Sequence, residues 1–321
     1  MSLTELDAED RPAHRSATSE ATPDSPPRPR GRHGRRHRLL QAPSLIVLGL
    51  VAVFPLLYSV NLSVRRYSPI LPDGDGRWAG LSNFSRLLHD SQFGRALVVT
   101  VIFIVCAVAL ETVIGLFVGA YLHRLAHAHR LVTTVLLLPM IATPLVVGLM
   151  FSFALNAQFG YLTWALQGLG IAGADGLLSN PNSALAVLIM VDVWEWVPFI
   201  ALMVIAGLRS LPQSPVEAAR IDGCSAPQIY RYVILPMLRP VLAVAVLFRA
   251  TEAVREFDKV YVLTGGGPGT ATTVNDLFQY KTAFATFDLS YGAALGLVSF
   301  VAVLVVSAVT FRFITRSGEY R

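Results

Sequence analysis

Long apolar runs alternate with short polar connections along most of the chain. A bilayer core about 30 Å thick is crossed by roughly 20 apolar residues in a helix. Backbone groups in lipid must pair within their own segment, so such runs are expected to be helical. The runs that are long and apolar enough are 45–64, 96–122, 131–155, 184–208 and 291–314. The pattern therefore predicts an all-α integral membrane protein.

A further stretch, 240–263, is apolar at both ends and charged in its middle. Its charged residues are Arg249, Glu252, Arg255, Glu256, Asp258 and Lys259. The length of the stretch fits one crossing, and a helix here gives the flanking arginines one consistent orientation. We therefore predict a bundle of six transmembrane helices within 39–321, with 240–263 as the fifth.

The distribution of lysine and arginine predicts the orientation, because cytoplasmic loops are enriched in these residues. Arginines lie in loop 123–130, in loop 209–239 and after the last span, whereas loop 156–183 has neither arginine nor lysine. Loop 264–290 has only Lys281, and loop 65–95, with five arginines, departs from the trend. We expect both ends of the chain to lie in the cytoplasm.

Residues 1–38 are poor in core-forming side chains, and six arginines lie between Arg28 and Arg38. Such a segment buries too little apolar surface to offset its ordering, so we expect a disordered tail. A basic run directly before a membrane helix is typical of the anionic cytoplasmic surface, and nucleic-acid binding is the less favoured interpretation. The first apolar run starts too late for a cleaved signal peptide, and we expect it to be retained.

Composition agrees with a membrane protein and excludes several kinds of site. Hydrophobic residues make up 54% of the chain and charged residues 15%, whereas a soluble domain carries about a quarter charged residues. Two cysteines, Cys106 and Cys224, neither form a disulfide framework nor indicate a metal site. His123 and His127 are four apart, but the glutamate of a zinc-protease motif is missing, so we expect no metal.

The loop 209–239 carries the most specific local pattern in the chain. Ser214, Pro215 and Glu217 have the spacing of a capping box. Gly223 suits the left-handed residue that ends a helix, and Ser225 with Gln228 repeats the capping spacing. The loop is therefore predicted to be two short helices joined by a glycine turn. Such a hairpin suits docking into a groove of a soluble partner, and a plain ordered loop is the equal alternative.

The stretch EAARIDGCSAPQIYRYVILP resembles the EAA loop of binding-protein-dependent ABC import permeases. Cys224 departs mildly, because a small residue is usual there. The resemblance implies that this loop inserts into a cleft of an ATPase subunit. The residues assigned to the coupling loop within 215–236 are Glu217, Ala218, Ala219, Ile221, Asp222, Gly223, Leu235 and Pro236.

Two other stretches are similar to the carbohydrate-uptake branch of that family. EFDKVYVLTGGGPGTATTVNDLFQYKTAF resembles the segment after the coupling loop in the first, maltose-type permease subunit, and VDVWEWVPF resembles its fourth-span signature. The resemblance covers about 40–315. It implies a complex with a second permease, two ATPase subunits and an external solute-binding protein.

No ATP-binding loop is present in the sequence. Such a loop needs a glycine-rich turn followed by Gly-Lys-Ser/Thr, and the only lysines, Lys259 and Lys281, follow Asp258 and Tyr280. We therefore expect this chain to be no enzyme and to bind no cofactor, with ATP and Mg²⁺ held by the partner ATPase.

Ionisable residues within spans are costly and usually face a cavity or a partner. A carboxylate can accept sugar hydroxyls, and an indole can cover the apolar face of a sugar. Helical spacing puts Arg249, Glu252, Glu256 and Lys259 on one face of the predicted helix. This face either forms a wall of the solute pathway or holds ion pairs that join helices. Glu111 is interpreted as a residue that pairs with a neighbouring helix. The predicted substrate-pathway residues are Asp192, Trp194, Glu195, Trp196, Arg249, Glu252, Arg255, Glu256 and Asp258.

These observations predict the permease subunit of an ATP-driven importer for a sugar or related polyhydroxyl solute. An ion-coupled secondary transporter is the first alternative, because the charges of 240–263 could serve one. A membrane-embedded enzyme is less favoured, because the spans hold no nucleophile–base pair or metal cluster. The identity of the solute stays open.

Overall fold

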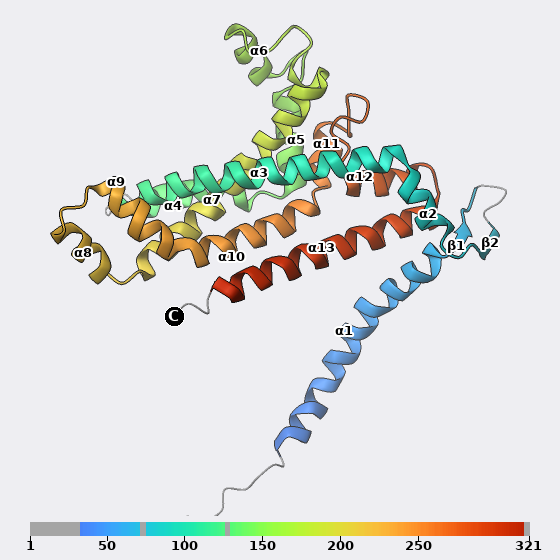
Figure 1. The fold of residues 1–321 in the computed structure, drawn as a ribbon. Coiled ribbons are helices and arrows are strands. Elements are labelled where there is room, and N and C mark those ends of the chain that lie inside the picture. Colours follow the sequence, from blue (N-terminus) through green and yellow to red (C-terminus); the bar gives the residue numbers. More distant parts are fainter. Residues whose placement is uncertain (1–32, 71–74, 126–128, 318–321) are drawn as a thin grey trace, which may run out of the picture. The chain divides into compact units, whose positions relative to one another are not determined.

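The computed structural model describes residues 33–70, 75–125 and 129–317 (Figure 1). The chain divides into two units, 1–54 and 55–321, and each is described by itself. The first unit contributes the amino-terminal part of helix α1 (His33–Ser63). Most of the predicted tail lies outside the described residues, although α1 begins within it, at His33.

The second unit is built from helices, with one small antiparallel sheet of β1 (Arg65–Tyr67) and β2 (Asp75–Trp78) among the described residues. Its long helices are α3 (Ser91–Arg124), α7 (Pro181–Ser210), α10 (Leu235–Val254) and α13 (Leu289–Ser317). The shorter helices are α2 (Ser82–His89), α4 (His129–Ile141), α5 (Pro144–Ala154), α6 (Tyr161–Gly168), α8 (Ser214–Ile221), α9 (Ala226–Ile229), α11 (Asp258–Leu263) and α12 (Asn275–Tyr280). Single turns are η1 (Leu177–Ser179), η2 (Tyr230–Ile234) and η3 (Lys281–Ala285), of which η2 and η3 are π-helical.

The all-α membrane fold predicted from hydropathy is confirmed. Within the described residues, five helices are long and apolar enough to cross a membrane, and a bent pair brings the number to six. The segments Ile46–Ser63, Ser91–Arg124, Pro181–Ser210 and Leu289–Ala308 correspond to the first, second, fourth and sixth predicted spans.

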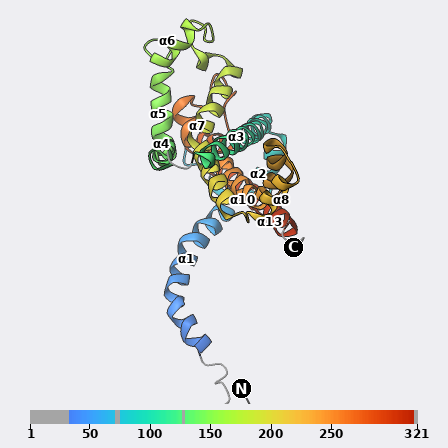
Figure 2. The same cartoon turned by 90° about the vertical axis from the view of Figure 1, so that its left-hand side faces the viewer.

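The third predicted span, 131–155, is broken into α4 and α5, which are bent by 94°. Thr143 lies in the extended region just before Pro144, the first residue of α5. A residue that precedes proline is disfavoured in the helical region, because the proline ring clashes with its backbone. In Figures 1 and 2, α5 and α6 extend away from the place where α3, α7 and α10 cross.

The prediction of a fifth span at 240–263 is wrong at both ends. The apolar helix runs from Ala226 to Val254 through α9, η2 and α10, so it begins inside the predicted loop. Beyond Val254 the chain leaves the helix, and α11 forms a separate turn that packs against α5. The stripe predicted along one continuous helix is therefore also wrong, because Arg249 and Lys259 lie on different helices.

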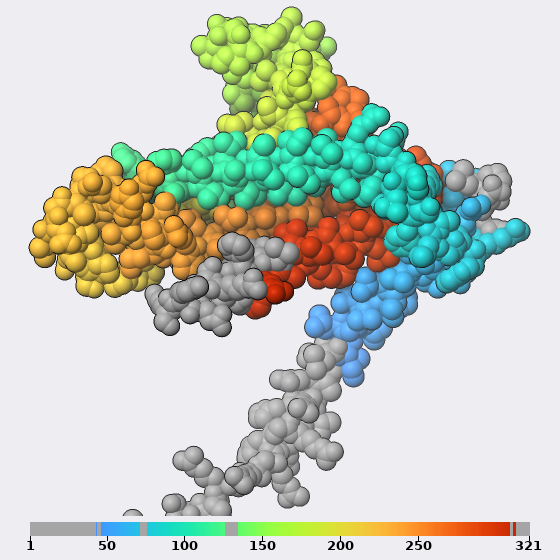
Figure 3. Space-filling view, in the orientation of Figure 1, coloured from blue at the N-terminus to red at the C-terminus, as the bar shows by residue number. Residues whose placement is uncertain are grey.

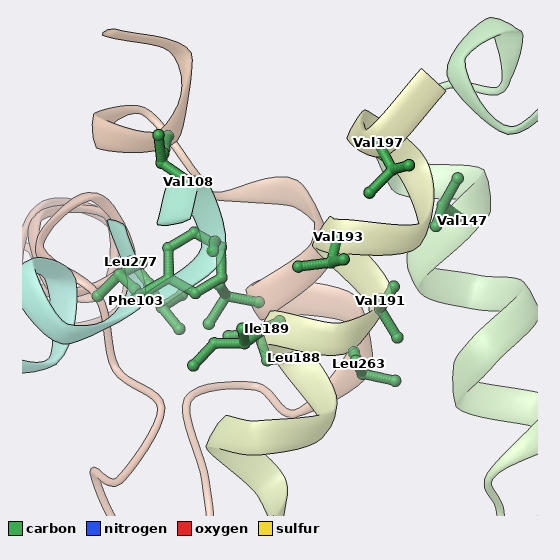
Figure 4. Packing of buried hydrophobic residues seen from close by; sticks show 14 residues of the cluster. Phe103, Val108, Val147, Leu188, Ile189, Val191, Val193, Val197, Leu263 and Leu277 are labelled. Atoms are coloured by element: carbon green, nitrogen blue, oxygen red, sulfur yellow. The ribbon is translucent and has the colours of Figure 1, made fainter. Parts of the chain in front are cut away.

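Small residues let the helices of the core approach closely. Gly115 and Gly119 of α3 have the small-xxx-small spacing of packed membrane helices, and an added Cβ would lie within 3 Å of Ile200 and Val204 of α7. The main apolar cluster joins α3, α5, α7, α10, α11 and α12 (Figure 4). It includes Phe103, which is fully buried.

A second set of contacts joins the start of α3 to the start of α13. Tyr291 Oη donates to Asp90 Oδ2 at 2.7 Å, and Arg86 Nη1 lies 2.6 Å from Asp288 Oδ2. Burial acts to raise the pKa of Asp90, but the hydrogen bonds from Tyr291 and from the backbone N–H groups of Gln92 and Phe93 outweigh it and lower that pKa below its usual value.

Candidate functional site

The loop between α7 and α10 forms a helical hairpin, as the sequence predicts. Its first helix, α8, ends at Gly223, whose φ of +81° lies in the left-handed region. The N–H of Cys224 donates to Ala219 O, and the N–H of Gly223 donates to Arg220 O. This pair of bonds is the Schellman motif, in which glycine is favoured because it has no Cβ. Gly223 therefore fixes the turn of the hairpin.

One of the two predicted capping boxes is wrong. Ser214 is the first residue of α8 rather than its cap; Gln213 takes that place, without a capping side-chain bond. At the second helix, the backbone N–H of Ser225 donates to Gln228 Oε1 at 2.8 Å, as a capping box requires. The second helix continues through the π-helical turn η2 into α10.

The residues matched to the EAA loop lie in two places, on α8 with its turn and at the start of α10. Glu217, Ala218, Ile221 and Asp222 are exposed, whereas Ala219 is buried. Leu235 and Pro236 are half-buried at the start of α10. An exposed isoleucine, 86% accessible, between two acidic side chains offers a soluble partner both apolar and charged contacts.

A cluster of buried ion pairs lies where α3, α7, α10 and α11 meet. We call it the ion-pair cluster, and its members are Glu111, Asp192, Glu195, Arg249, Glu256 and Lys259. Asp192 lies at its centre, because one carboxylate oxygen contacts Arg249 Nη2 and the other accepts from Lys259 Nζ. The exposure of these residues ranges from 0% to 8%.

Each cation of the cluster has further partners. Arg249 Nε lies 2.8 Å from Glu111 Oε2, and the guanidinium lies 4.6 Å from the ring centroid of Trp196. Lys259 Nζ lies 2.6 Å from Glu195 Oε2 and 3.1 Å from Glu256 Oε2. Two cations, one on α10 and one on α11, thus join four carboxyl groups that come from α3, from α7 and from the link between α10 and α11. This arrangement fixes how those helices pack.

The other predicted pathway residues lie outside the ion-pair cluster. Trp194 is 42% exposed and packs edge-on against Phe151. Glu252 and Asp258 are half-buried, and Arg255 is exposed. The role of these residues in a pathway stays a prediction.

Two members of the ion-pair cluster were not among the predicted pathway residues. Lys259 was placed on the predicted stripe but given no site role, and Glu111 was expected to pair between helices, as it does with Arg249. The sequence did contain a signal for this role of Lys259, because the lysine lies in a stretch predicted to be a membrane helix. A cation buried there needs carboxylates near it.

No group of residues that could hold a metal ion is found in the described part of the chain. Cys106 and Cys224 are both free and exposed. Of the two histidines considered for zinc, His127 lies outside the described residues.

The sequence matches known transport proteins. Residues 111–317 match the family of the binding-protein-dependent transport system inner membrane component. A probable ABC transporter permease protein, y4oQ of Sinorhizobium fredii, is 36% identical over 83% of this chain and 85% of its own length. The trehalose/maltose transport system permease protein MalF of Thermococcus litoralis is 33% identical over 83% of this chain and 89% of its own length.

The fold matches solved structures as well. A bacterial ABC transporter involved in the import of the acidic polysaccharide alginate superimposes with a TM-score of 0.71, at 20% identity, over 88% of this chain and 96% of that chain. At that identity the likeness concerns the fold, and the sequence match establishes the relationship. The chain thus belongs to the family of inner membrane components of binding-protein-dependent transport systems, the multi-pass permease subunits of ABC importers.

Proposed function

We propose that this chain is the sugar-importer permease that its relatives suggest, with the solute a sugar or a related polyhydroxyl compound. Its relatives include a trehalose/maltose permease, and the alginate importer shares its fold. The observation that carries the coupling part of the proposal is the exposed hairpin of α8 and α9, whose Schellman turn presents Glu217 and Ile221 outward.

The hairpin would dock into a cleft of an ATPase subunit, and that subunit would hold ATP and Mg²⁺. Support comes from the sequence, which has no Gly-Lys-Ser/Thr motif of the kind that binds the β- and γ-phosphates of ATP. The helix from Ala226 to Val254 continues directly from the hairpin into the membrane bundle. A movement of the hairpin would therefore reach α10 without crossing a flexible link.

The exposed and half-buried side chains near the ion-pair cluster would line the solute pathway, while the cluster holds the wall in place. Trp194 offers a ring face for the apolar side of a sugar, and Glu252, Arg255 and Asp258 offer hydrogen-bonding groups. ATP binding and hydrolysis in the partner would shift the bundle between outward-facing and inward-facing states.

The complex would contain a second permease, two ATPase subunits and an external solute-binding protein. Both ends of the chain would lie in the cytoplasm, with the hairpin on the same side. Support comes from the arginines of loop 209–239 and from the absence of lysine and arginine in loop 156–183.

The test is transport by the assembled complex in proteoliposomes, with variants of the hairpin. Gly223→Val places a β-branched residue at a φ of +81°, where a Cβ is strained. It should lower both sugar uptake and sugar-stimulated ATP hydrolysis while leaving the affinity of the solute-binding protein unchanged. Ser214→Ala is the matched control, because Ser214 is exposed on the same helix and makes no capping bond.

Two results would contradict the proposal. Normal uptake in Gly223→Val and in Glu217→Ala would exclude the hairpin as the coupling element. Uptake that proceeds without any ATPase subunit would favour the ion-coupled alternative.

A further inference from the structure

Two neighbouring cavities lie at the base of the hairpin, where the end of α3 meets η2 and the start of α10. Figure 3 shows α3 lying against the hairpin and α10 in this region. The first, of about 370 Å³, lies between the end of α3 and α8. The second, of about 480 Å³, is a groove between the last two turns of α3 and the start of the helix that leads into α10. The volume of this groove falls in the range of small-molecule sites. Arg124 and Tyr230 line both cavities.

The groove is apolar along its length and basic at one end. Arg124 and Arg231 supply the positive charge, and Arg220 lines the adjoining cavity. The apolar part of the groove is lined by Leu116, Phe117, Ala120, Tyr121, Leu235 and Leu238. Among the described residues that line the two cavities there is no aspartate or glutamate.

The basic end of the groove is held in place but not neutralised. The guanidinium of Arg124 lies 5.0 Å from the ring centroid of Tyr230, a cation–π contact between α3 and η2. No carboxylate in the described part of the chain forms an ion pair with Arg124 or Arg231. Both arginines are exposed, so their charges are available to an outside group.

The π-helical turn gives the groove its shape. Tyr230 and Arg231 stand at the start of η2, and a π-turn inside a longer helix is frequent at functional sites. A π-turn adds a residue to the turn and rotates the side chains that precede it. From this turn Tyr230 contacts Arg124 of α3, and Tyr230 and Arg231 both line the groove.

We propose that this groove binds an anionic phospholipid, with the headgroup phosphate between Arg124 and Arg231 and one acyl chain along Phe117 and Leu238. The charge of the groove is complementary to the anionic lipids of a cytoplasmic leaflet, where this end of α3 lies in the proposed orientation. The apolar lining suits an acyl chain better than an acidic protein segment. The bound lipid would connect α3 to the base of the hairpin and so influence how the hairpin moves.

The test is native mass spectrometry of the purified full-length chain, incubated with equal amounts of phosphatidylglycerol and phosphatidylcholine that carry the same acyl chains. The wild-type chain should retain phosphatidylglycerol in preference. The double variant Arg124→Gln/Arg231→Gln should lose that preference by about thirtyfold, or about 2 kcal/mol, because each arginine near an anionic headgroup contributes about half of that. The measurement needs no transport, so its failure would leave the proposed function standing.

Two further variants separate charge from shape. Arg239→Gln removes an exposed arginine of α10 that lines neither cavity, and it should leave the lipid preference unchanged. Ala120→Trp keeps both arginines but fills the groove, and it should abolish retention of the lipid. If the double variant does not fold, Ala120→Trp alone carries the test.

Several outcomes would overturn the proposal. One is equal retention of the two lipids by the wild-type chain; another is the same loss of preference in Arg239→Gln as in the double variant. Full displacement of the lipid by inorganic phosphate would show that the acyl chain contributes nothing. Lipid retention by Ala120→Trp equal to the wild type would place the lipid elsewhere.

Discussion

Asp192→Asn is the most informative single change in the ion-pair cluster. The substitution keeps the size of the side chain and removes its charge. Asp192 contacts both Arg249 and Lys259, and all three residues are fully buried. The change thus deprives two buried cations of the anion that they share.

The expected loss of stability follows from the contacts that remain. Arg249 keeps Glu111 at 2.8 Å, and Lys259 keeps Glu195 at 2.6 Å. Removing one partner of a buried ion pair costs about 3–5 kcal/mol, because the other charge stays buried. By contrast, Glu256→Gln removes one contact of 3.1 Å to Lys259, which keeps Asp192 and Glu195, and we expect its cost to be a fraction of that.

The assay is thermal unfolding of the purified full-length chain in detergent. Asp192→Asn should lower the unfolding temperature on the order of 10 °C, and Glu256→Gln is the matched control within the same cluster. The double variant Asp192→Asn/Lys259→Met should lose less than the sum of the two single changes, because the contact between Asp192 and Lys259 is lost in both of them. Equal shifts for Asp192→Asn and Glu256→Gln, or strictly additive effects in the double variant, would refute the central place given to Asp192.

Two other changes test the packing of α3. Gly119→Leu should destabilise the chain by roughly 1–3 kcal/mol or more. The reason is that an added Cβ would lie 2.7 Å from Ala201 O and 2.8 Å from Val204 Cβ. An unchanged unfolding temperature would contradict the close approach of α3 and α7. Asp90→Asn should destabilise the chain at neutral pH. The pKa of Asp90 is lower in the folded chain than its usual value, so its carboxylate stabilises the fold at pH values above the unfolded pKa of about 4. This stabilisation is lost as the pH falls through the lowered pKa of Asp90, so the melting curves of the wild type and of Asp90→Asn should converge in acid. If the two unfolding temperatures still differed in acid, the hydrogen bond from Tyr291 to Asp90 would be excluded as the cause of the difference.

Hydropathy predicted most of the bundle because the bilayer imposes a length and a composition on any helix that crosses it. The predicted fourth span at 184–208 agrees with α7 to within three residues at each end. The break in the third span was not predicted, although Pro139 and Pro144 were visible, because a proline in a membrane helix can kink it, break it or leave it almost straight.

The fifth span was misplaced for a different reason. A periodicity argument assumes that one helix continues, and it therefore put Arg249 and Lys259 on one stripe. The chain instead breaks after Val254, and α11 brings Lys259 to the carboxylates of Asp192 and Glu195 on α7. Which groups pair with a buried charge is determined by tertiary contacts between distant segments. The spacing of residues along one segment does not predict those contacts.

The hairpin and the ion-pair cluster are joined by one uninterrupted helical path, and this connection favours transmission by a rigid element. From Ile229 to Arg249 the chain rises about 30 Å at 1.5 Å per residue, without a break among the described residues. At the far end of that path Arg249 is tied to Glu111 on α3 and to Asp192 on α7. A displacement of α10 would have to carry those helices with it or separate buried charges, which is costly. In the proposed importer, the cluster would thus make α3, α7 and α10 respond together to the hairpin.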